Sequence, residues 1–102
     1  MRSTFTLVYL IITAVLSGQE SEIVAKRVVP QKAETGYAFT EGPAVAKDGS
    51  VYFTDQPNDR IYRWDEQEGI SLWLEGTERS NGLYFTPDYK LVACADEQNR
   101  II

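Results

Sequence analysis

The sequence contains no histidine and only one cysteine, Cys94. Without histidine the chain cannot form a Ser-His-Asp or Cys-His triad, nor a zinc site with histidine ligands. A single cysteine excludes a disulfide within the chain, so in an oxidising compartment the thiol must be buried or paired with another molecule. Because Cys94 lies in the apolar run 91–95, we expect it to be a small residue of the core.

Basic residues are also few, since ten Lys and Arg stand against fifteen Asp and Glu, and the net charge is −5. The chain has no run of more than two basic residues. Nucleic acids and anionic membranes bind to basic surfaces, so neither is an expected partner.

One long apolar run is present, at residues 5–16, and it follows Arg2 and precedes the small residues Ser17 and Gly18. A basic start, an apolar stretch and small residues at a cleavage point are typical of a secretory signal peptide. We therefore expect residues 1–18 to be removed and the protein to be exported, to a periplasm or outside the cell, without a stable membrane anchor. The alternative is that the segment remains as an uncleaved anchor.

Two stretches of the chain are copies of each other, offset by about 40 residues without a gap. The positions identical in the two copies are Gly42 and Gly82, Asp48 and Asp88, Arg60 and Arg100, and Ile61 and Ile101. Repeats of roughly 40 residues built from short strands are typical of β-propeller blades.

The apolar and β-branched segments between turn residues predict short strands in both copies. These strands are expected at residues 44–46, 51–54, 60–64 and 70–74, and again at 83–85, 91–95 and 100–102. Asp48 and Gly49 predict a tight turn, in which Asp48 serves the turn. Because Tyr89 replaces the turn glycine in the second copy, we expect a different type of turn there.

The predicted fold class is all-β, a β-propeller. We expect an N-terminal segment at 19–38 with a possible ring-closing strand, a first blade at 39–78 and a partial second blade at 79–102. An unrelated all-β domain that contains two similar hairpins is the alternative.

Glu41 and Asn81 precede the glycine that opens the inner strand of each copy. Inner strands of a propeller line one central channel, so these two side chains should converge there. Carboxylate and amide oxygens are hard ligands that suit Ca²⁺, Mg²⁺ or Mn²⁺. The alternatives are a structural carboxylate of the turn or rim for Glu41, and a turn amide for Asn81.

Three segments of the first copy, 39–43, 48–55 and 58–65, resemble the opening of the SMP-30/gluconolactonase/luciferin-regenerating-enzyme-like family. Residues 79–83 and 91–96 are similar to the next blade of that family. The resemblance implies a six-bladed propeller that hydrolyses a small-molecule sugar lactone with one divalent cation. Ca²⁺ is the first expectation for this cation, and Mg²⁺, Mn²⁺ or Zn²⁺ are alternatives.

The resemblance also implies roles for individual residues. Glu41 matches the first metal ligand, Asn81 matches a polar residue of the metal and substrate site, and Arg79 matches an arginine that contacts substrate. On the sequence alone, the favoured interpretation of Arg79 is a surface arginine paired with Glu78 or with a nearby carboxylate. The remaining ligands of the family have no counterpart in this chain, and no general base is identified.

The expected function is therefore that of the N-terminal portion of an exported, metal-dependent sugar lactone hydrolase. A noncatalytic secreted propeller that binds a partner, and an inactive truncated gene product, are the alternatives. A six-bladed ring needs about 240 residues, so we expect this chain to supply about two blades. Two unclosed blades expose sheet edges and faces, and we expect this portion alone to be inactive and prone to aggregate.

Overall fold

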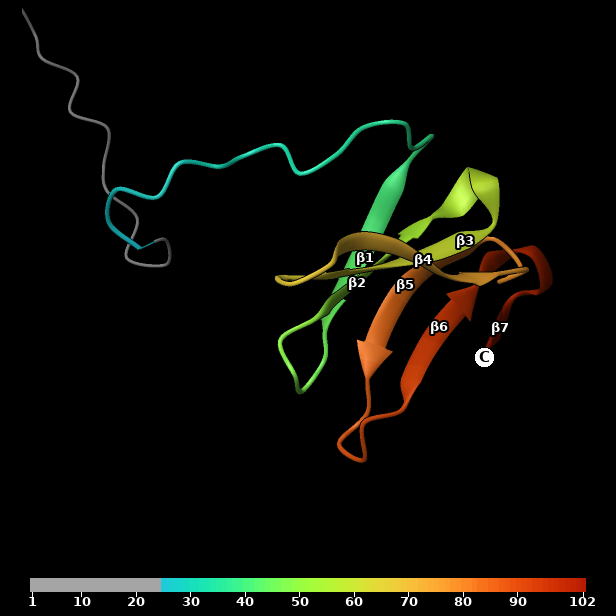
Figure 1. Cartoon of the computed structure of the whole chain (residues 1–102). Helices are drawn as coiled ribbons and strands as arrows, with labels where there is room; N and C mark the ends of the chain where they lie inside the picture. The colour runs from blue at the N-terminus through green and yellow to red at the C-terminus, as the bar shows by residue number, and fades with distance from the viewer. Residues whose placement is uncertain (1–24) are drawn as a thin grey trace, which may run out of the picture. The chain divides into compact units, whose positions relative to one another are not determined.

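The computed structural model describes residues 25–102, which form seven strands in two antiparallel sheets (Figure 1). The first sheet has the order β1-β2-β3-β4, with β1 at Thr40–Val45, β2 at Val51–Asp55, β3 at Arg60–Asp65 and β4 at Gly69–Glu75. The second has the order β5-β6-β7, with β5 at Ser80–Phe85, β6 at Leu91–Ala95 and β7 at Arg100–Ile101. The predicted all-β class is confirmed.

Residues 32–102 form the compact unit that carries both sheets, whereas residues 25–31 belong to a separate unit. In the N-terminal segment, no strand is present between residue 25 and the start of β1. The predicted signal peptide at 1–18 and the beginning of the predicted ring-closing strand lie outside the described residues. Among residues 25–102 there is no helix long and apolar enough to cross a membrane.

The two sheets repeat each other in their connections. In the first hairpin the Gly49 N–H donates to the Ala46 carbonyl at 3.0 Å, and in the second the Tyr89 N–H donates to the Thr86 carbonyl at 2.8 Å. The expectation of a different type of turn in the second copy is wrong. Gly49 and Tyr89 both have a positive φ, of 89° and 63° respectively. The Tyr89 ring makes a cation–π contact with the ammonium of Lys47, which lies 4.6 Å from the ring centre.

In each sheet a single 3₁₀ turn connects the second strand to the third. These turns are η1 (Gln56–Asn58), between β2 and β3, and η2 (Asp96–Gln98), between β6 and β7. Each turn ends in a left-handed residue, Asp59 with φ 58° and Asn99 with φ 51°. Asp and Asn tolerate this region better than other non-glycine residues. The repeat therefore conserves the geometry of the connection as well as its length.

The core lies where the two sheets meet. Within residues 25–102 the buried apolar side chains are Ile61, Ala93 and Ala95. Beside them the Tyr52 ring lies edge-on to Phe85 of β5, with 5.4 Å between ring centres. Figure 1 shows the two sheets side by side, with β1 next to β5.

Cys94 is exposed, so its predicted place in the core is wrong. Its neighbours Ala93 and Ala95 are buried, and successive side chains of a strand point to opposite faces. Ala93 and Ala95 take the face that is covered by the first sheet, and Cys94 takes the other face.

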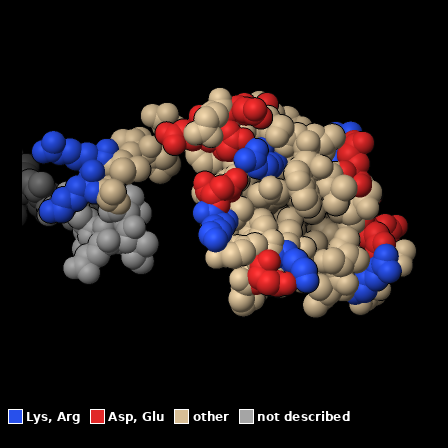
Figure 2. Space-filling model, turned by 60° about the horizontal axis from the view of Figure 1, so that its bottom comes forward, with Lys and Arg blue, Asp and Glu red and all other residues tan. Residues whose placement is uncertain are grey.

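Charged side chains of both signs are interspersed around the margin of the sheets in the view of Figure 2, with an uncharged surface between them. Several charged side chains of the sheets form ion pairs, such as Arg60 with Glu75 at 2.9 Å and Arg63 with Asp65 at 2.5 Å.

Candidate functional site

The backbones of Glu41 and Asn81 adjoin each other where β1 passes β5. A Cβ added to Gly42 would lie 2.1 Å from the Asn81 carbonyl oxygen and 3.0 Å from the Gly82 Cα. Gly42 also has a φ of +58°, which favours glycine. The structure thus brings together the two residues that the repeat places at equivalent positions, and glycine is the residue that permits this approach.

The hydroxyl of Thr54 connects the two backbones. Its oxygen lies 3.0 Å from the Glu41 carbonyl oxygen and 3.2 Å from the Asn81 carbonyl oxygen, and the residue is fully buried. One hydroxyl donates one hydrogen, which these two acceptors share. Thr54 therefore links the inner strands of the first and second sheets, and we call this arrangement the Thr54 clasp.

Both inner strands are irregular at the same place. The pairing register shifts between Glu41 and Ala44 in β1 and between Ser80 and Leu83 in β5. Such irregularities bend a strand locally and change the direction of side chains. The candidate residues Glu41 and Asn81 therefore lie at bulges, where side chains leave the regular alternation of the sheet.

The side chains of Glu41 and Asn81 are both half-buried. The Asn81 Oδ1 accepts a hydrogen bond of 2.7 Å from the Gly82 N–H, which leaves this amide oxygen one further lone pair. Within residues 25–102, the structure records no hydrogen bond or ion pair to the Glu41 carboxylate. The Asn81 Oδ1 and the Glu41 carboxylate can therefore each accept a further hydrogen bond or bind a cation.

Arg79 lies just before Asn81, in an unusual backbone conformation. Arg79 and the preceding Glu78 have positive φ values of 53° and 54°. The Asp59 carboxylate holds this segment, because its Oδ1 accepts the Arg79 N–H at 2.7 Å and the Thr77 hydroxyl at 3.1 Å. Asp59 therefore fixes the chain that leads into β5.

The Arg79 guanidinium is exposed and donates to the neutral Gln56 Oε1 at 3.3 Å. The alternative pairing with Glu78 is not formed, since Glu78 binds Arg100 instead, with 2.8 Å between Nε and Oε2. The hydrogen bond from Arg100 lowers the pKa of the Glu78 carboxyl. Arg79 thus keeps a positive charge without a carboxylate partner among its recorded hydrogen bonds in residues 25–102.

Asp55 anchors the segment that precedes Glu41. It is 1% exposed and accepts the N–H groups of Phe39 and Ala38 at 3.0 and 3.1 Å and the Asn58 amide at 2.8 Å. Burial raises the pKa of the Asp55 carboxyl, but these hydrogen bonds outweigh burial and hold the pKa below its usual value. No role for Asp55 was assigned from the sequence.

A hollow of about 340 Å³ lies beside Asn81 at the open side of the second sheet. Its lining combines amide, carboxylate and guanidinium groups with apolar side chains, from Asn81, Cys94, Ala95, Asp96, Asn99, Arg100 and Ile101. Glu41 and Arg79 do not line it. The structure therefore joins Glu41 to Asn81 through the backbone, and places Asn81 alone among the predicted site residues in this hollow.

The donor chemistry of Glu41 and Asn81 suits a hard divalent cation, which binds carboxylate and amide oxygens. Ca²⁺ takes six to eight oxygen ligands. Among residues 25–102, no three Cys, Asp or Glu side chains come together to hold a metal ion. The residues present therefore fit a cation by type and supply part of its ligand shell.

The comparisons with known proteins bear on the fold. No family model matches the chain, and no curated protein matches it. A solved gluconolactonase from Xanthomonas campestris is similar to this chain, with a TM-score of 0.60 and 24% identity over 64% of the chain. The chain spans 22% of the length of that protein. The likeness supports a gluconolactonase-like fold for the two sheets.

Proposed function

We propose that this chain is the N-terminal portion of an exported, metal-dependent hydrolase of sugar lactones, built as a six-bladed propeller. The two sheets are its first two blades. The repeat of about 40 residues and the likeness to a gluconolactonase support the architecture. The observation that carries the proposal is the Thr54 clasp, which brings Glu41 and Asn81 from successive inner strands to one place.

In this proposal Glu41 and Asn81 hold a divalent cation, Ca²⁺ first, through their side-chain oxygens. A bound cation supplies Lewis acidity toward a lactone carbonyl. Arg79 presents a planar, permanently charged fork that donates hydrogen bonds to sugar hydroxyls or to the oxyanion that develops during hydrolysis. Asp59 positions Arg79 by holding its backbone N–H.

The test is Glu41→Gln in the protein that carries this sequence, with Glu66→Gln as the matched control. Both changes remove one carboxylate charge, but Glu66 lies exposed in the turn between β3 and β4. Because an amide is a weaker ligand than a carboxylate, we expect Glu41→Gln to weaken Ca²⁺ binding and to lower the rate of lactone hydrolysis at least about 100-fold.

Calcium affinity is measured by titration calorimetry, and hydrolysis by the release of acid from a sugar lactone. Glu66→Gln should leave both unchanged. If Glu41→Gln turns over lactone at the normal rate in saturating cation, then Glu41 has no part in the site.

A further inference from the structure

Polar side chains connect the two sheets at the end where Glu41 and Asn81 lie. Gln56 and Asp96 begin the two 3₁₀ turns, directly after β2 and β6, and they are equivalent positions of the repeat. The end of β2 pairs with the start of β1, and the end of β6 pairs with the start of β5. Both turns therefore lie beside the starts of the inner strands.

The side-chain amide of Gln56 contacts a charged group on each of its sides. Its Oε1 accepts a hydrogen bond of 3.3 Å from the Arg79 Nη2, and its Nε2 donates one of 3.5 Å to the Asp96 Oδ2. A primary amide can accept from a cation and donate to an anion at the same time. Gln56 thus joins Arg79 and Asp96 in one connected arrangement, which we call the Gln56 bridge.

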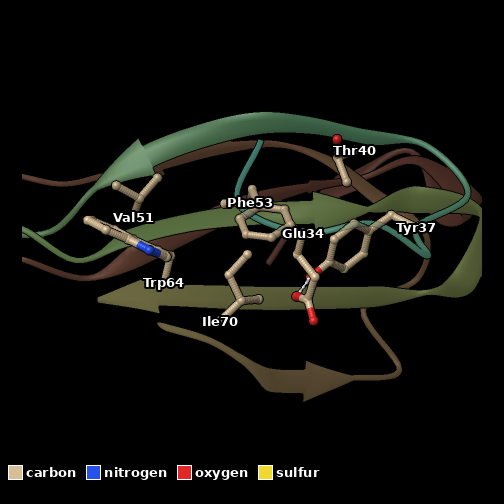
Figure 3. Close-up of a pocket in the computed structure, with 8 residues that line it drawn as sticks. Glu34, Tyr37, Thr40, Val51, Phe53, Trp64 and Ile70 are labelled. Carbon is tan, nitrogen blue, oxygen red and sulfur yellow. Dashed lines mark hydrogen bonds between the residues drawn. The ribbon is translucent and has the colours of Figure 1, made fainter. Parts of the chain in front are cut away.

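The backbone that carries Gln56 is fixed by its neighbours. The Gln56 N–H donates to the Phe39 carbonyl at 3.2 Å, and the next residue is Pro57, whose ring restricts φ. The segment that leads to Phe39 is itself packed on the first sheet. Figure 3 shows the Tyr37 ring beside Phe53, to which it lies edge-on with 5.5 Å between ring centres. The Gln56 amide therefore extends from a well-held point of the chain.

Arg79 and Asp96 are exposed, and both can make further hydrogen bonds. A guanidinium has five N–H donors, a carboxylate has about four acceptor sites, and the bridge uses one of each. The two groups differ in what they bind. Arg79 donates hydrogens, whereas the Asp96 carboxylate accepts them.

We propose that Arg79 and Asp96 form a subsite for two hydroxyl groups of a lactone, and that Gln56 is the residue that positions them. A hydroxyl both donates and accepts hydrogen bonds, so one hydroxyl oxygen binds the guanidinium and another hydroxyl donates to the carboxylate. The inference rests on the proposed function and extends it, because it gives roles to Gln56 and Asp96 and names the feature of the substrate that is selected.

The feature selected is the presence of hydroxyl groups on the lactone ring. A lactone without hydroxyls displaces water from Arg79 and Asp96 but returns no hydrogen bonds to them. A site built to bind a hydroxyl discriminates against an analogue that lacks it. The Gln56 bridge should therefore favour polyhydroxylated lactones over unsubstituted ones.

The test compares two lactones with the same ring in the protein that carries this sequence. Glucono-δ-lactone has ring hydroxyls, and δ-valerolactone has none. We expect Asp96→Asn and Gln56→Leu each to lower kcat/KM for glucono-δ-lactone at least about 10-fold more than for δ-valerolactone, mainly through KM. Equal losses on the two lactones would overturn the subsite.

The matched controls make the same chemical changes at the opposite end of the sheets. Asp88→Asn alters the turn between β5 and β6, and Gln67→Leu alters the turn between β3 and β4. Both residues are exposed. Both control variants should leave the preference between the two lactones unchanged, and a control that lost the preference would overturn its assignment to the Gln56 bridge.

A combined variant separates positioning from a direct or structural role of Gln56. If Gln56 acts through Arg79 and Asp96, its effect disappears once both are altered, because residues of one network are not additive. Adding Gln56→Leu to a chain that already has Arg79→Gln and Asp96→Asn should change KM for glucono-δ-lactone less than about 2-fold. A further change of about 10-fold would overturn the positioning role.

Binding of sorbitol keeps the subsite separate from hydrolysis, because this polyol has hydroxyls but no lactone group. Titration calorimetry should show at least about 5-fold weaker binding to Asp96→Asn and Gln56→Leu than to Asp88→Asn. Protein that binds sorbitol in this way but hydrolyses neither lactone would overturn the proposed function and support the subsite. Sorbitol binding that is absent, or equal in all three variants, would overturn the subsite.

Discussion

The substitution Gly42→Ala tests the close approach of the two inner strands. The added methyl group would lie 2.1 Å from the Asn81 carbonyl oxygen, where real Cβ contacts do not occur, and the atoms it meets belong to the backbone. No side-chain rotation relieves this overlap. The strands β1 and β5 must move apart, and the Thr54 clasp must open.

The free energy of unfolding falls for two separable reasons. A left-handed φ costs a non-glycine residue about 1–2 kcal/mol. Opening of the Thr54 clasp leaves a buried carbonyl without its donor, at about 1–3 kcal/mol. Together these amount to a loss of about 2–5 kcal/mol, which is a large fraction of the stability of a small domain.

Gly49→Ala is the matched control, because Gly49 also has a positive φ, of +89°, but an added Cβ meets nothing within 4 Å. It should lose only the conformational part. Both variants are unfolded in urea at one protein concentration, with tryptophan fluorescence as the signal. Gly42→Ala should lose about 1–3 kcal/mol more than Gly49→Ala. Equal losses would show that the two inner strands do not touch in the way described.

Three further predictions concern the residues around Glu41. Thr54→Val should lower the free energy of unfolding by about 1–3 kcal/mol whereas Thr54→Ser keeps most of it, and a stable valine variant in urea unfolding would contradict the clasp. The folded-state pKa of Asp55 lies below the unfolded value, so its stabilisation is present above the unfolded pKa and is lost as pH falls through the folded pKa. Asp55→Asn should therefore flatten the fall of the melting temperature between about pH 5 and 2, and an unchanged slope would exclude Asp55 as its source. Arg79→Gln should raise KM for a sugar lactone several-fold more than it lowers kcat, and unchanged steady-state kinetics would remove Arg79 from substrate binding.

Strand positions could be predicted from the sequence because the repeat and the turn residues mark them twice. The strand predicted at residues 91–95 is β6 with the same bounds, and the strand at 51–54 is β2 with one more residue, Asp55. The first strand begins earlier than predicted, at Thr40, because the bulge after Glu41 allows pairing with β2 to continue past Gly42 and Pro43. A bulge interrupts the alternation from which a strand is predicted, so the residues before the bulge, from Thr40, were not included in the predicted strand.

The exposed position of Cys94 could not be predicted, because alternation along a strand separates two faces without identifying the covered one. Ala93 and Ala95 are as apolar as Cys94 in the sequence, and only the packing of the second sheet on the first distinguishes them. The conformation of Tyr89 was missed for a related reason. Hairpin hydrogen bonds impose the positive φ there, although tyrosine has no preference for it.

The repeat identified the pair Glu41 and Asn81, because both copies have a polar residue before the same glycine. Asp55 was missed because its counterpart in the second copy is Ala95, so the repeat draws no attention to it. A clue to Asp59 was present, since its counterpart Asn99 belongs to the other residue type that tolerates a left-handed backbone. Asp59 and Asn99 share a left-handed backbone conformation, but in the sequence they resemble ordinary turn residues.

Thr54 and Cys94 show how one position of the repeat takes different roles in the two sheets. Both occupy the same position in the repeat, but a thiol is a much weaker hydrogen-bond donor than a hydroxyl. The contact between the two sheets therefore depends on the Thr54 hydroxyl, which binds both backbone carbonyls, and on Gly42, which lets the two inner strands approach.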